Sequence, residues 1–427
     1  MNYKSYITNE GNVDNDGPDI VYYNMDIISG ADNEKQLGGD SNILRFSETR
    51  STPIINNISK YYFSIIRFSM NGPNKDLPLC VLPIKTGATQ TDINLTNLKM
   101  SITMLKGTKA LQTSTRDVIY VSESLDAFTN SGTALPNQPL QNVDRRGVYY
   151  WIYSYDHFTK LINTTIQNCF TDLQASYNAA VGGASTIITQ PAKLVYNENN
   201  KLFEFYFDCN GWSDLSSCNV SLGSASPTNE TFKISFNADL YNLLSNFDYK
   251  NVGFVNTSLQ YQLLISNKNY KNYVKYGTVA ANLNPQPSTA GYIVMSQNYE
   301  STSTLWSPIS SIVFTSGTIP LVAEGVAAPT IYSDNTNGNT TTNAFQPIIT
   351  DIALGMDNGA SSYREMISYV PSAEYRLSSF TNSNQPLTQI DIQIYWKSRL
   401  DLNLYPVAMP AYSSTSIKIM FKKKHLV

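Results

Sequence analysis

Alternation of apolar and polar side chains marks the clearest strands of this chain. Residues 390–396 and 416–421 both alternate with a period of two, which is typical of strands with one buried face. Residues 60–68 are almost continuously apolar, a pattern that favours burial on both faces of a strand. The segment 99–104 alternates as well, and we expect it to be half exposed. Further strand-like segments are 20–23, 117–122, 148–155, 193–197, 201–208, 230–236, 257–266, 290–297 and 309–315.

Helical periodicity is found in two places. Apolar residues recur every three or four positions between Phe158 and Tyr177, and a pair of glycines follows. This spacing predicts a helix with one apolar stripe and with Asp156 as its N-cap. A shorter stripe predicts a second helix over 237–247. Residues 333–343 have no apolar side chain and predict a surface loop.

Composition supports an all-β fold. Charged residues make up 15% of the 427 positions, against about 25% in an average soluble domain. Polarity comes instead from Ser, Thr and Asn, while 29 Tyr and 17 Phe suit half-buried pleated surfaces. About a dozen strands with turn-rich connections favour a β-sandwich or jelly roll with an elaborated middle. Because a single core stops growing at about 250–300 residues, we expect two or three compact modules or one core with large insertions.

The sequence offers little material for catalysis or for a metal site. The histidines are His157, in the first turn of the predicted helix, and His425, and neither has a nucleophile motif beside it. The four cysteines lack zinc-site spacing, although Cys209 and Cys218 could form a disulfide in an exported protein. No glycine-rich nucleotide-binding motif is present. We therefore expect no enzyme, no cofactor and no bound metal.

A glycan-binding or glycan-cleaving β-protein stays open as an alternative. The aromatic-rich segment 149–155 would be its sugar platform, and Glu204 and Asp208 its carboxylates. Residues four apart on a strand are about 13 Å from each other, which is too far for a retaining pair. Ordinary solvated charges explain these two residues better, and exposed aromatics would be needed to revive the alternative.

Charge and hydropathy limit the partners of the chain. The net charge of −3 provides no general attraction to nucleic acid. Residues 1–18 read as an extended arm with no apolar leader, and no segment has about 20 uninterrupted apolar residues. We expect no membrane span and a protein that is intracellular and soluble at synthesis.

Two charged stretches call for an explanation. Glu48 and Arg50 precede a proline-fixed entry into a strand, which suits either an ordinary surface ion pair or a contact between subunits. Lys422, Lys423 and Lys424 form a basic tail after the last strand. The tail could touch a nucleic acid, or it could protect an exposed strand end against edge pairing, which is the favoured interpretation.

The order of several segments resembles that of a known family. The segments are ETRSTPII at 48–55, YYFSIIRF at 61–68, LWSP at 305–308, IVFTS at 312–316, AEYRL at 373–377, IDI at 390–392, YWK at 395–397, LYP at 404–406 and SIKIMFKKK at 416–424. In this order they resemble the penton (minor capsid) proteins of Polinton-type elements, polinton-like viruses and virophages. The likeness covers a little over half of the chain, and no segment is diagnostic alone. One departure lies at 409–413, where a glycine-containing turn is expected.

The resemblance implies a structural virion protein. Such a penton assembles as a homopentamer at the fivefold vertices of an icosahedral capsid, among trimers of the major capsid protein, after synthesis in the host cytoplasm or a virus factory. A host receptor or vertex fibre would be a further partner, although no Arg-Gly-Asp motif is present. In the family, the N- and C-terminal segments form a jelly roll around a central insertion. We accordingly expect the jelly roll in 1–155 and 291–427, and an insertion domain with both helices in 156–290.

Four residues are candidates for subunit contacts. They are Arg50, Trp306, Arg376 and Trp396, because arginine and aromatic side chains dominate the energetics of interfaces. The two tryptophans also suit a hydrophobic core. A second capsid hypothesis is a trimeric major capsid protein with two jelly rolls, each of about 200 residues.

Overall fold

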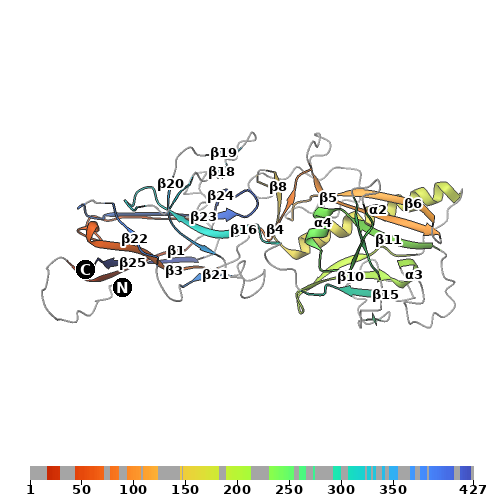
Figure 1. Ribbon diagram of the computed structural model, residues 1–427, viewed down its shortest axis with the longest axis horizontal. Helices are drawn as coiled ribbons and strands as arrows, with labels where there is room; N and C mark the ends of the chain where they lie inside the picture. The colour runs from red at the N-terminus through yellow and green to blue at the C-terminus, as the bar shows by residue number, and fades with distance from the viewer. Residues whose placement is uncertain are drawn as a thin grey trace. The chain divides into compact units, whose positions relative to one another are not determined.

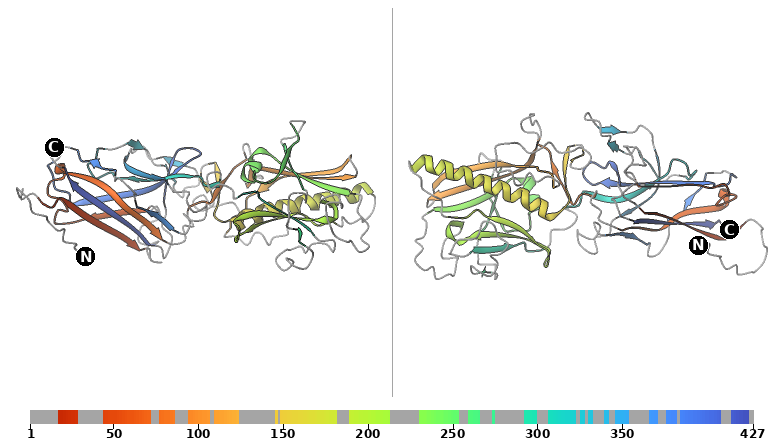
Figure 2. Two further views of the ribbon diagram at one scale, coloured as in Figure 1. Left: turned by 60° about the horizontal axis from the view of Figure 1, so that its bottom comes forward. Right: turned by 180° about the vertical axis from the view of Figure 1, so that it is seen from behind.

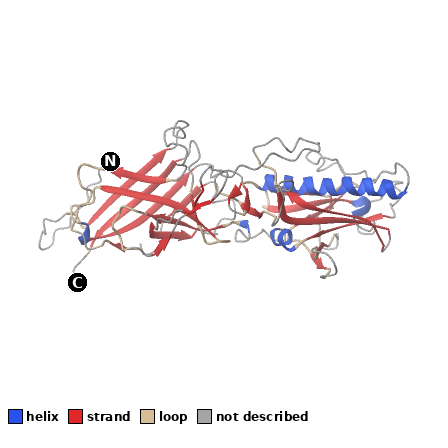
Figure 3. Cartoon of the chain, turned by 90° about the horizontal axis from the view of Figure 1, so that it is seen from above, coloured by secondary structure: helices blue, strands red, loops and turns tan. Residues whose placement is uncertain are grey.

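A computed structural model divides the chain into two compact units, residues 1–79 with 307–427 and residues 80–306. The structure describes residues 17–28, 44–71, 77–85, 94–106, 109–123, 145–146, 148–181, 189–212, 230–253, 259–265, 273–274, 292–299, 306–322, 325–327, 330–332, 339–341, 346–353, 366–370, 376–381, 384–407 and 414–424. Strands dominate both units, and one long helix belongs to the second (Figure 3).

Eight strands of the first unit form two antiparallel sheets that lie face to face (Figure 1). The first sheet has the order β1 (Ile20–Ile28), β25 (Ser414–Lys423), β3 (Tyr61–Asn71) and β21 (Met366–Tyr369). The second has the order β2 (Arg45–Thr49), β23 (Gln389–Ser398), β16 (Ile309–Thr315) and β20 (Gln346–Ala353). Numbered along the chain, these eight strands have the orders 1-8-3-6 and 2-7-4-5, which is the jelly-roll topology. The predicted fold class is therefore confirmed.

Short elements complete this unit. They are the 3-10 helix η1 (Ile58–Lys60), β17 (Gly325–Ala327) beside β20, β22 (Ser378–Ser379) beside β3, β24 (Leu404–Pro406) beside β23, and the hairpin of β18 (Thr330–Tyr332) and β19 (Asn339–Thr341). The hairpin corrects part of the loop predicted over 333–343, because residues 339–341 pair with β18. Residues 333–338 lie outside the described part.

The core of the jelly roll lies between its two sheets. Phe68 of β3 meets Phe314 of β16 edge to face, with ring centroids 5.2 Å apart. Ile392 and Ile394 of β23 are buried on the same inner side, as the period-two pattern predicts. Ile417 of β25 is buried likewise. Each such side chain contributes about 1.5–3 kcal/mol through its burial.

The second unit contains three sheets. One has the order β12 (Tyr249–Asn251), β13 (Tyr261–Leu263), β11 (Glu230–Phe236), β5 (Leu95–Lys106) and β6 (Lys109–Ile119). Another has the order β14 (Tyr273–Val274), β15 (Tyr292–Ser296), β10 (Leu202–Asp208) and β9 (Lys193–Asn197). The smallest joins β4 (Cys80–Pro83), β8 (Tyr149–Ile152) and β7 (Arg145–Arg146). These orders do not repeat the jelly roll, so the double jelly-roll hypothesis finds no support in the described strands.

Helix α2 (Tyr155–Val181) lies along the strands of the second unit (Figure 2). Its predicted apolar stripe is confirmed, because Phe158, Leu161 and Leu173 are buried. The predicted N-cap is wrong: the Ser154 hydroxyl accepts the His157 N–H at 3.0 Å, while Asp156 lies in the first turn. The shorter helices are α3 (Cys209–Trp212) and α4 (Ala238–Leu243), the second within the predicted range.

The boundaries between the two units lie between residues 79 and 80 and between residues 306 and 307. The sequence pattern predicts them between residues 155 and 156 and between residues 290 and 291. Strand pairing accounts for this difference. β5 pairs with β11 from Met100 opposite Phe236 to Lys106 opposite Glu230, and α2 lies against β5 and β6. The segment 95–119 therefore belongs to the same core as the predicted insertion.

Several expectations fall on residues outside the described part of the chain. These are the arm before residue 17, the turn at 409–413, Cys218 and His425. Cys80 and Cys169 are buried, and neither forms a disulfide in the described part of the chain. Among the described helices, none combines the length and the apolar character that crossing a membrane requires.

An ion pair joins α2 to its sheet and provides a test by pH. Asp172 accepts hydrogen bonds from Arg116 (2.8 and 2.7 Å) and Ser114 (2.8 Å), and the Arg116 bond chiefly lowers the pKa of Asp172. The unfolded chain therefore binds this proton at higher pH, near the ordinary value of about 3.9. The stabilisation is complete above that pH and is lost as the pH falls through the lowered pKa.

We expect Asp172→Asn to lose less stability than the unaltered chain between pH 5 and 3. The difference at pH 7 should stay below about 1 kcal/mol, because the pair is partly exposed. Urea unfolding across this pH range, followed by tryptophan fluorescence, measures the effect. Asp156→Asn removes an equal charge from the same helix without touching the sheet, and an equal response of the two variants would contradict the assignment.

Candidate assembly surface

One open side of the jelly roll lies between the edge strands β1 and β2. There the Arg50 Nε donates to Glu48 Oε1 at 3.0 Å, and the guanidinium carbon lies 5.5 Å from the ring centroid of Tyr23. Burial raises the pKa of Tyr23 to about 12, helped by its hydrogen bond to Glu48. Since Tyr23 belongs to one sheet and Glu48 to the other, this cluster joins the two sheets.

The other open side carries a second arginine. Arg376 Nη1 donates to Asp351 Oδ1 at 2.7 Å and to the Asp351 carbonyl at 3.2 Å. Asp351 lies on β20, whereas Arg376 precedes β22, which pairs with β3 of the opposite sheet. Both side chains are about half exposed. The pair therefore connects the two sheets while it remains open to a partner.

Trp306 and Trp396 are core residues, which corrects their candidacy as surface anchors. Each is only 2% exposed. The ring centroid of Trp306 lies 4.8 Å from that of Phe158 and 5.2 Å from that of Phe203. The Trp306 Nε1 donates to the Leu243 carbonyl at 3.2 Å. Trp396 occupies an inner position of β23 and is buried in the jelly roll. Burial within the chain leaves no ring surface for a neighbouring subunit.

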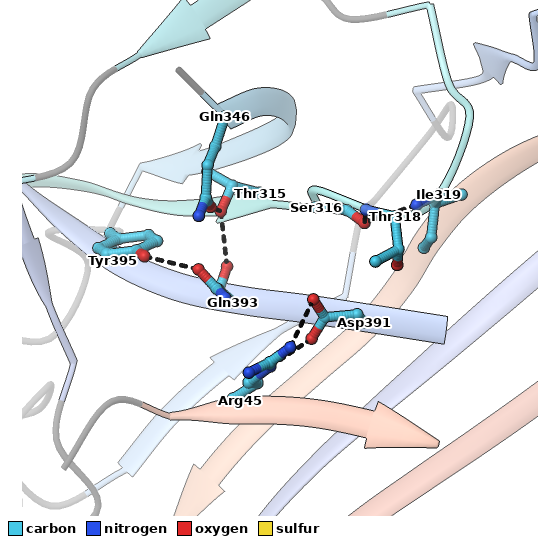
Figure 4. A network of polar contacts seen from close by, with 9 residues as sticks. All are labelled: Arg45, Thr315, Ser316, Thr318, Ile319, Gln346, Asp391, Gln393 and Tyr395. Carbon is cyan, nitrogen blue, oxygen red and sulfur yellow. Dashed lines mark hydrogen bonds and ion pairs between the residues drawn. The ribbon is translucent and has the colours of Figure 1, made fainter. Parts of the chain in front are cut away.

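A salt bridge that the sequence analysis missed lies on the outer face of the second sheet (Figure 4). Arg45 Nε donates to Asp391 Oδ1 at 2.5 Å and Nη2 donates to Oδ2 at 3.0 Å. This hydrogen bonding raises the pKa of Arg45. The Asp391 side chain is 3% exposed, although its alternating strand pattern indicates solvent. No local signal could reveal this pair, because 346 positions separate its members.

Apolar and polar groups cover the rest of this outer face. Val313, Tyr395 and Leu404 form a small buried cluster, with Ile348 beside it. Burial raises the pKa of Tyr395 to about 12. The Tyr395 hydroxyl donates to Gln393 Oε1 at 2.7 Å (Figure 4). The centre of this face is therefore covered by the chain itself, while Arg45 and Asp351 at its sides stay about half exposed.

A turn between β23 and β24 presents two exposed leucines. Leu400 and Leu402 are both exposed, and Leu402 has φ = 61°. The Ser398 hydroxyl accepts the N–H groups of Leu400 at 3.2 Å and Asp401 at 3.4 Å, which fixes the turn. A left-handed backbone costs a residue with a side chain about 1–2 kcal/mol. An exposed leucine held in this conformation suggests a functional contact.

The basic tail is part of a central strand. Lys422 and Lys423 belong to β25, which lies between β1 and β3, and the Lys424 N–H donates to the Lys60 carbonyl at 2.7 Å. The favoured interpretation of the tail, protection of an exposed strand edge, is therefore wrong.

The residues considered for catalysis have structural roles. His157 is buried, with Nε2 2.7 Å from the Val121 carbonyl. Glu204 is also buried and accepts hydrogen bonds from Asn197, Asn200 and Tyr206. Within the described ranges, no group of three or more His, Cys, Asp or Glu could hold a metal ion.

The aromatic segment at 149–155 is largely covered by the chain itself. Tyr150 and Trp151 are buried, and Tyr155 stacks on Tyr196 with ring centroids 3.8 Å apart. Tyr149, Tyr153 and Tyr155 are only partly exposed. The row of exposed, stacked rings that would favour glycan binding is therefore not found in this segment.

A jelly roll, here with a large insertion between its third and fourth strands, is a fold that viral capsid proteins share with lectins and cupins, so the fold alone does not assign a role. The family model for the Sputnik minor capsid protein V18/19 matches residues 21–423, and the chain belongs to this family. It is therefore a minor capsid protein, a structural component of the virion.

Individual relatives agree with this membership. The chain is 31% identical to the uncharacterized protein V18 of Sputnik virophage over 169 residues, which are 38% of this chain and 89% of V18. Its fold is similar to a chain of the Sputnik virophage structure from cryo-EM, with TM-score 0.67, 21% identity and coverage of 96% and 99% of the two chains. It is also similar to the mavirus penton protein crystal structure, with TM-score 0.55, 15% identity and coverage of 95% and 99%.

The two arginine pairs beside β2 should differ in their contribution to stability. We expect Arg45→Ala to lower the free energy of unfolding by about 2 kcal/mol, because it leaves a buried carboxylate without its hydrogen bonds. Arg50→Ala should cost less than about 1 kcal/mol, since its pair is exposed. Urea denaturation measures both variants. The double variant Arg45→Ala with Asp391→Asn should recover part of the loss, and failure to do so would contradict the role of the buried charge.

Proposed function

We propose that this minor capsid protein is a penton, which assembles as a homopentamer at the fivefold vertices of an icosahedral capsid and contacts the surrounding trimers of the major capsid protein. The observation that carries the proposal is the chemical difference between the two open sides of the jelly roll. One side has Arg50 with Glu48 and Tyr23, whereas the other has Arg376 beside the exposed Val322 and Leu377.

A closed ring needs two different surfaces that fit each other. In a heterologous contact, one side of a subunit meets the other side of its neighbour, and the ring closes after a fixed number of copies. Beside Arg376, Val322 and Leu377 are exposed, and the Val322 N–H donates to the Ser379 carbonyl at 2.7 Å. Arginine together with exposed apolar side chains is the composition of an interface centre. We assign this side to the subunit contact.

The turn of Leu400 and Leu402 is a second proposed contact. Its leucines are exposed and its backbone conformation is costly, so an apolar neighbour would provide a compensating gain. The low share of charged residues limits repulsion between identical subunits.

The proposal includes no catalytic activity, no cofactor and no metal. His157 and Glu204, two of the residues considered for catalysis, are buried and hydrogen-bonded within the chain, which agrees with this part of the proposal. The capsid vertex is the proposed location, after synthesis in the host cytoplasm or a virus factory.

Native mass spectrometry of the full chain tests the ring. We expect a species that contains five 47.6-kDa chains, with fivefold classes in negative-stain images. Arg376→Ala should weaken this species about tenfold without changing the melting temperature of the subunit by more than a few degrees, because the pair is exposed. Arg116→Ala removes an ion pair of similar exposure from the second unit and serves as the control.

Leu402→Gly separates assembly from folding. The change relieves the left-handed conformation, so the free energy of unfolding should stay equal or rise by up to about 1 kcal/mol. The same change should weaken the ring about tenfold, since the apolar side chain is lost. A trimer would contradict the proposal. So would a protein that stays monomeric at every concentration in solution and forms no ring in reassembled capsids.

A further inference from the structure

The outer face of the β1–β25–β3–β21 sheet carries a group of cations. Ile417, Ile419 and Phe421 of β25 are buried toward the core, so the alternate residues Lys418 and Lys422 point outward. Lys424 follows this outward row, and Arg67 of β3 is exposed opposite Lys418. We call Arg67, Lys418, Lys422 and Lys424 the cationic face.

The register places like charges directly opposite each other. Lys418 pairs with Arg67 across the β25–β3 ladder. Cross-strand pairs of equal charge destabilise a sheet unless an anion neutralises them. In the described part of the chain, no carboxylate forms an ion pair with Arg67 or with Lys418. Asp26 of β1 lies opposite Ser416, one outward position from Lys418, but no ion pair joins it to Lys418.

Two tyrosines lie among these cations. The Lys418 Nζ is 4.6 Å from the ring centroid of Tyr22, and the Lys424 Nζ is 5.2 Å from that of Tyr62. Tyr22 is half exposed. Buried Met420 separates Lys418 from Lys422 along the outer side of β25. The face therefore combines cations and aromatic rings on a surface that extends along a strand.

The composition of the face suits a single strand of nucleic acid. Its four cations can neutralise phosphates, which supply most of the sequence-independent affinity of proteins for nucleic acid. Surfaces that bind single strands combine such cations with aromatic rings on which bases stack. An acidic polypeptide would use the charges but would have no use for the rings.

We propose that the cationic face binds nucleic acid, with its lysines and Arg67 on the phosphates and with Tyr22 and Tyr62 stacking on unpaired bases. Net charge gave no reason to expect this, because the chain carries −3 overall. The proposal needs only the jelly-roll sheet and does not depend on the number of subunits in a ring. In a virion protein, the packaged genome would be the nucleic acid within reach.

Binding of a fluorescent 20-nucleotide single strand to the full-length chain tests the proposal by anisotropy between 50 and 200 mM salt. We expect the triple variant Lys418→Gln, Lys422→Gln and Lys424→Gln to bind at least tenfold more weakly at 50 mM. The slope of log affinity against log salt should fall by about 2, since three phosphate contacts are lost. A matching Lys→Arg triple should retain binding.

A second triple controls for net charge. Lys201→Gln, Lys233→Gln and Lys250→Gln change three exposed lysines of the second unit and alter the total charge equally. This variant should bind as the unaltered chain does. Equal losses in the two triples, or no binding by the unaltered chain at 50 mM salt, would overturn the proposal.

The tyrosines distinguish nucleic acid from other polyanions. Tyr22→Ala with Tyr62→Ala should weaken binding of the single strand about tenfold and leave the salt slope unchanged, while the Tyr→Phe pair should bind normally. Displacement by heparin or polyaspartate should respond to the lysine variants but not to the tyrosine variants. If the alanine pair binds the strand normally, the face is a general polyanion site and the assignment to nucleic acid fails. Melting temperatures and ring mass, measured on the same variants, show that a loss of binding is not a loss of folding or assembly.

Discussion

The jelly roll depends on the pairing of its last strand, β25, with its first strand, β1. Ile20 of β1 lies opposite Lys422 of β25, and β25 in turn pairs with β3 along almost its whole length. The central position in one sheet of the jelly roll is therefore filled from the far end of the chain. Loop-closure entropy grows only with the logarithm of loop length, so a second unit of 227 residues between β3 and β16 adds little to the cost of this pairing.

This arrangement gives each surface of the jelly roll a different chemistry. Its two open sides are joined by arginine pairs, and the outer face of the β23 sheet is covered by the cluster around Tyr395. The outer face of the β25 sheet carries lysines, which lie in the centre of that sheet because β25 does. A capsid subunit meets several partners at once, and separate surfaces allow each contact to be optimised without disturbing the others.

Local sequence patterns predicted the individual helices and strands better than they predicted which of these elements share a core. The period-two pattern of 390–396 and the stripe from Phe158 to Tyr177 correspond to β23 and α2, since both reflect one buried face. The assignment of 95–119 to the second unit depends on pairing with β11, more than 100 residues away, and leaves no local trace. The burial of Asp391 likewise depends on a partner far along the chain, Arg45. Trp396 shows that residue type alone cannot separate an anchor from a core side chain.

The central place of β25 also sets the order of events during synthesis. The second unit is one continuous segment, so all of it has emerged before the jelly roll can close. Until residues 414–423 leave the ribosome, β1 and β3 have no strand between them, and both present unpaired edges. An interrupted chain therefore lacks a complete sheet and offers no finished surface for incorporation into a shell. The sheet that β1 and β3 share is therefore completed only when β25 has been made.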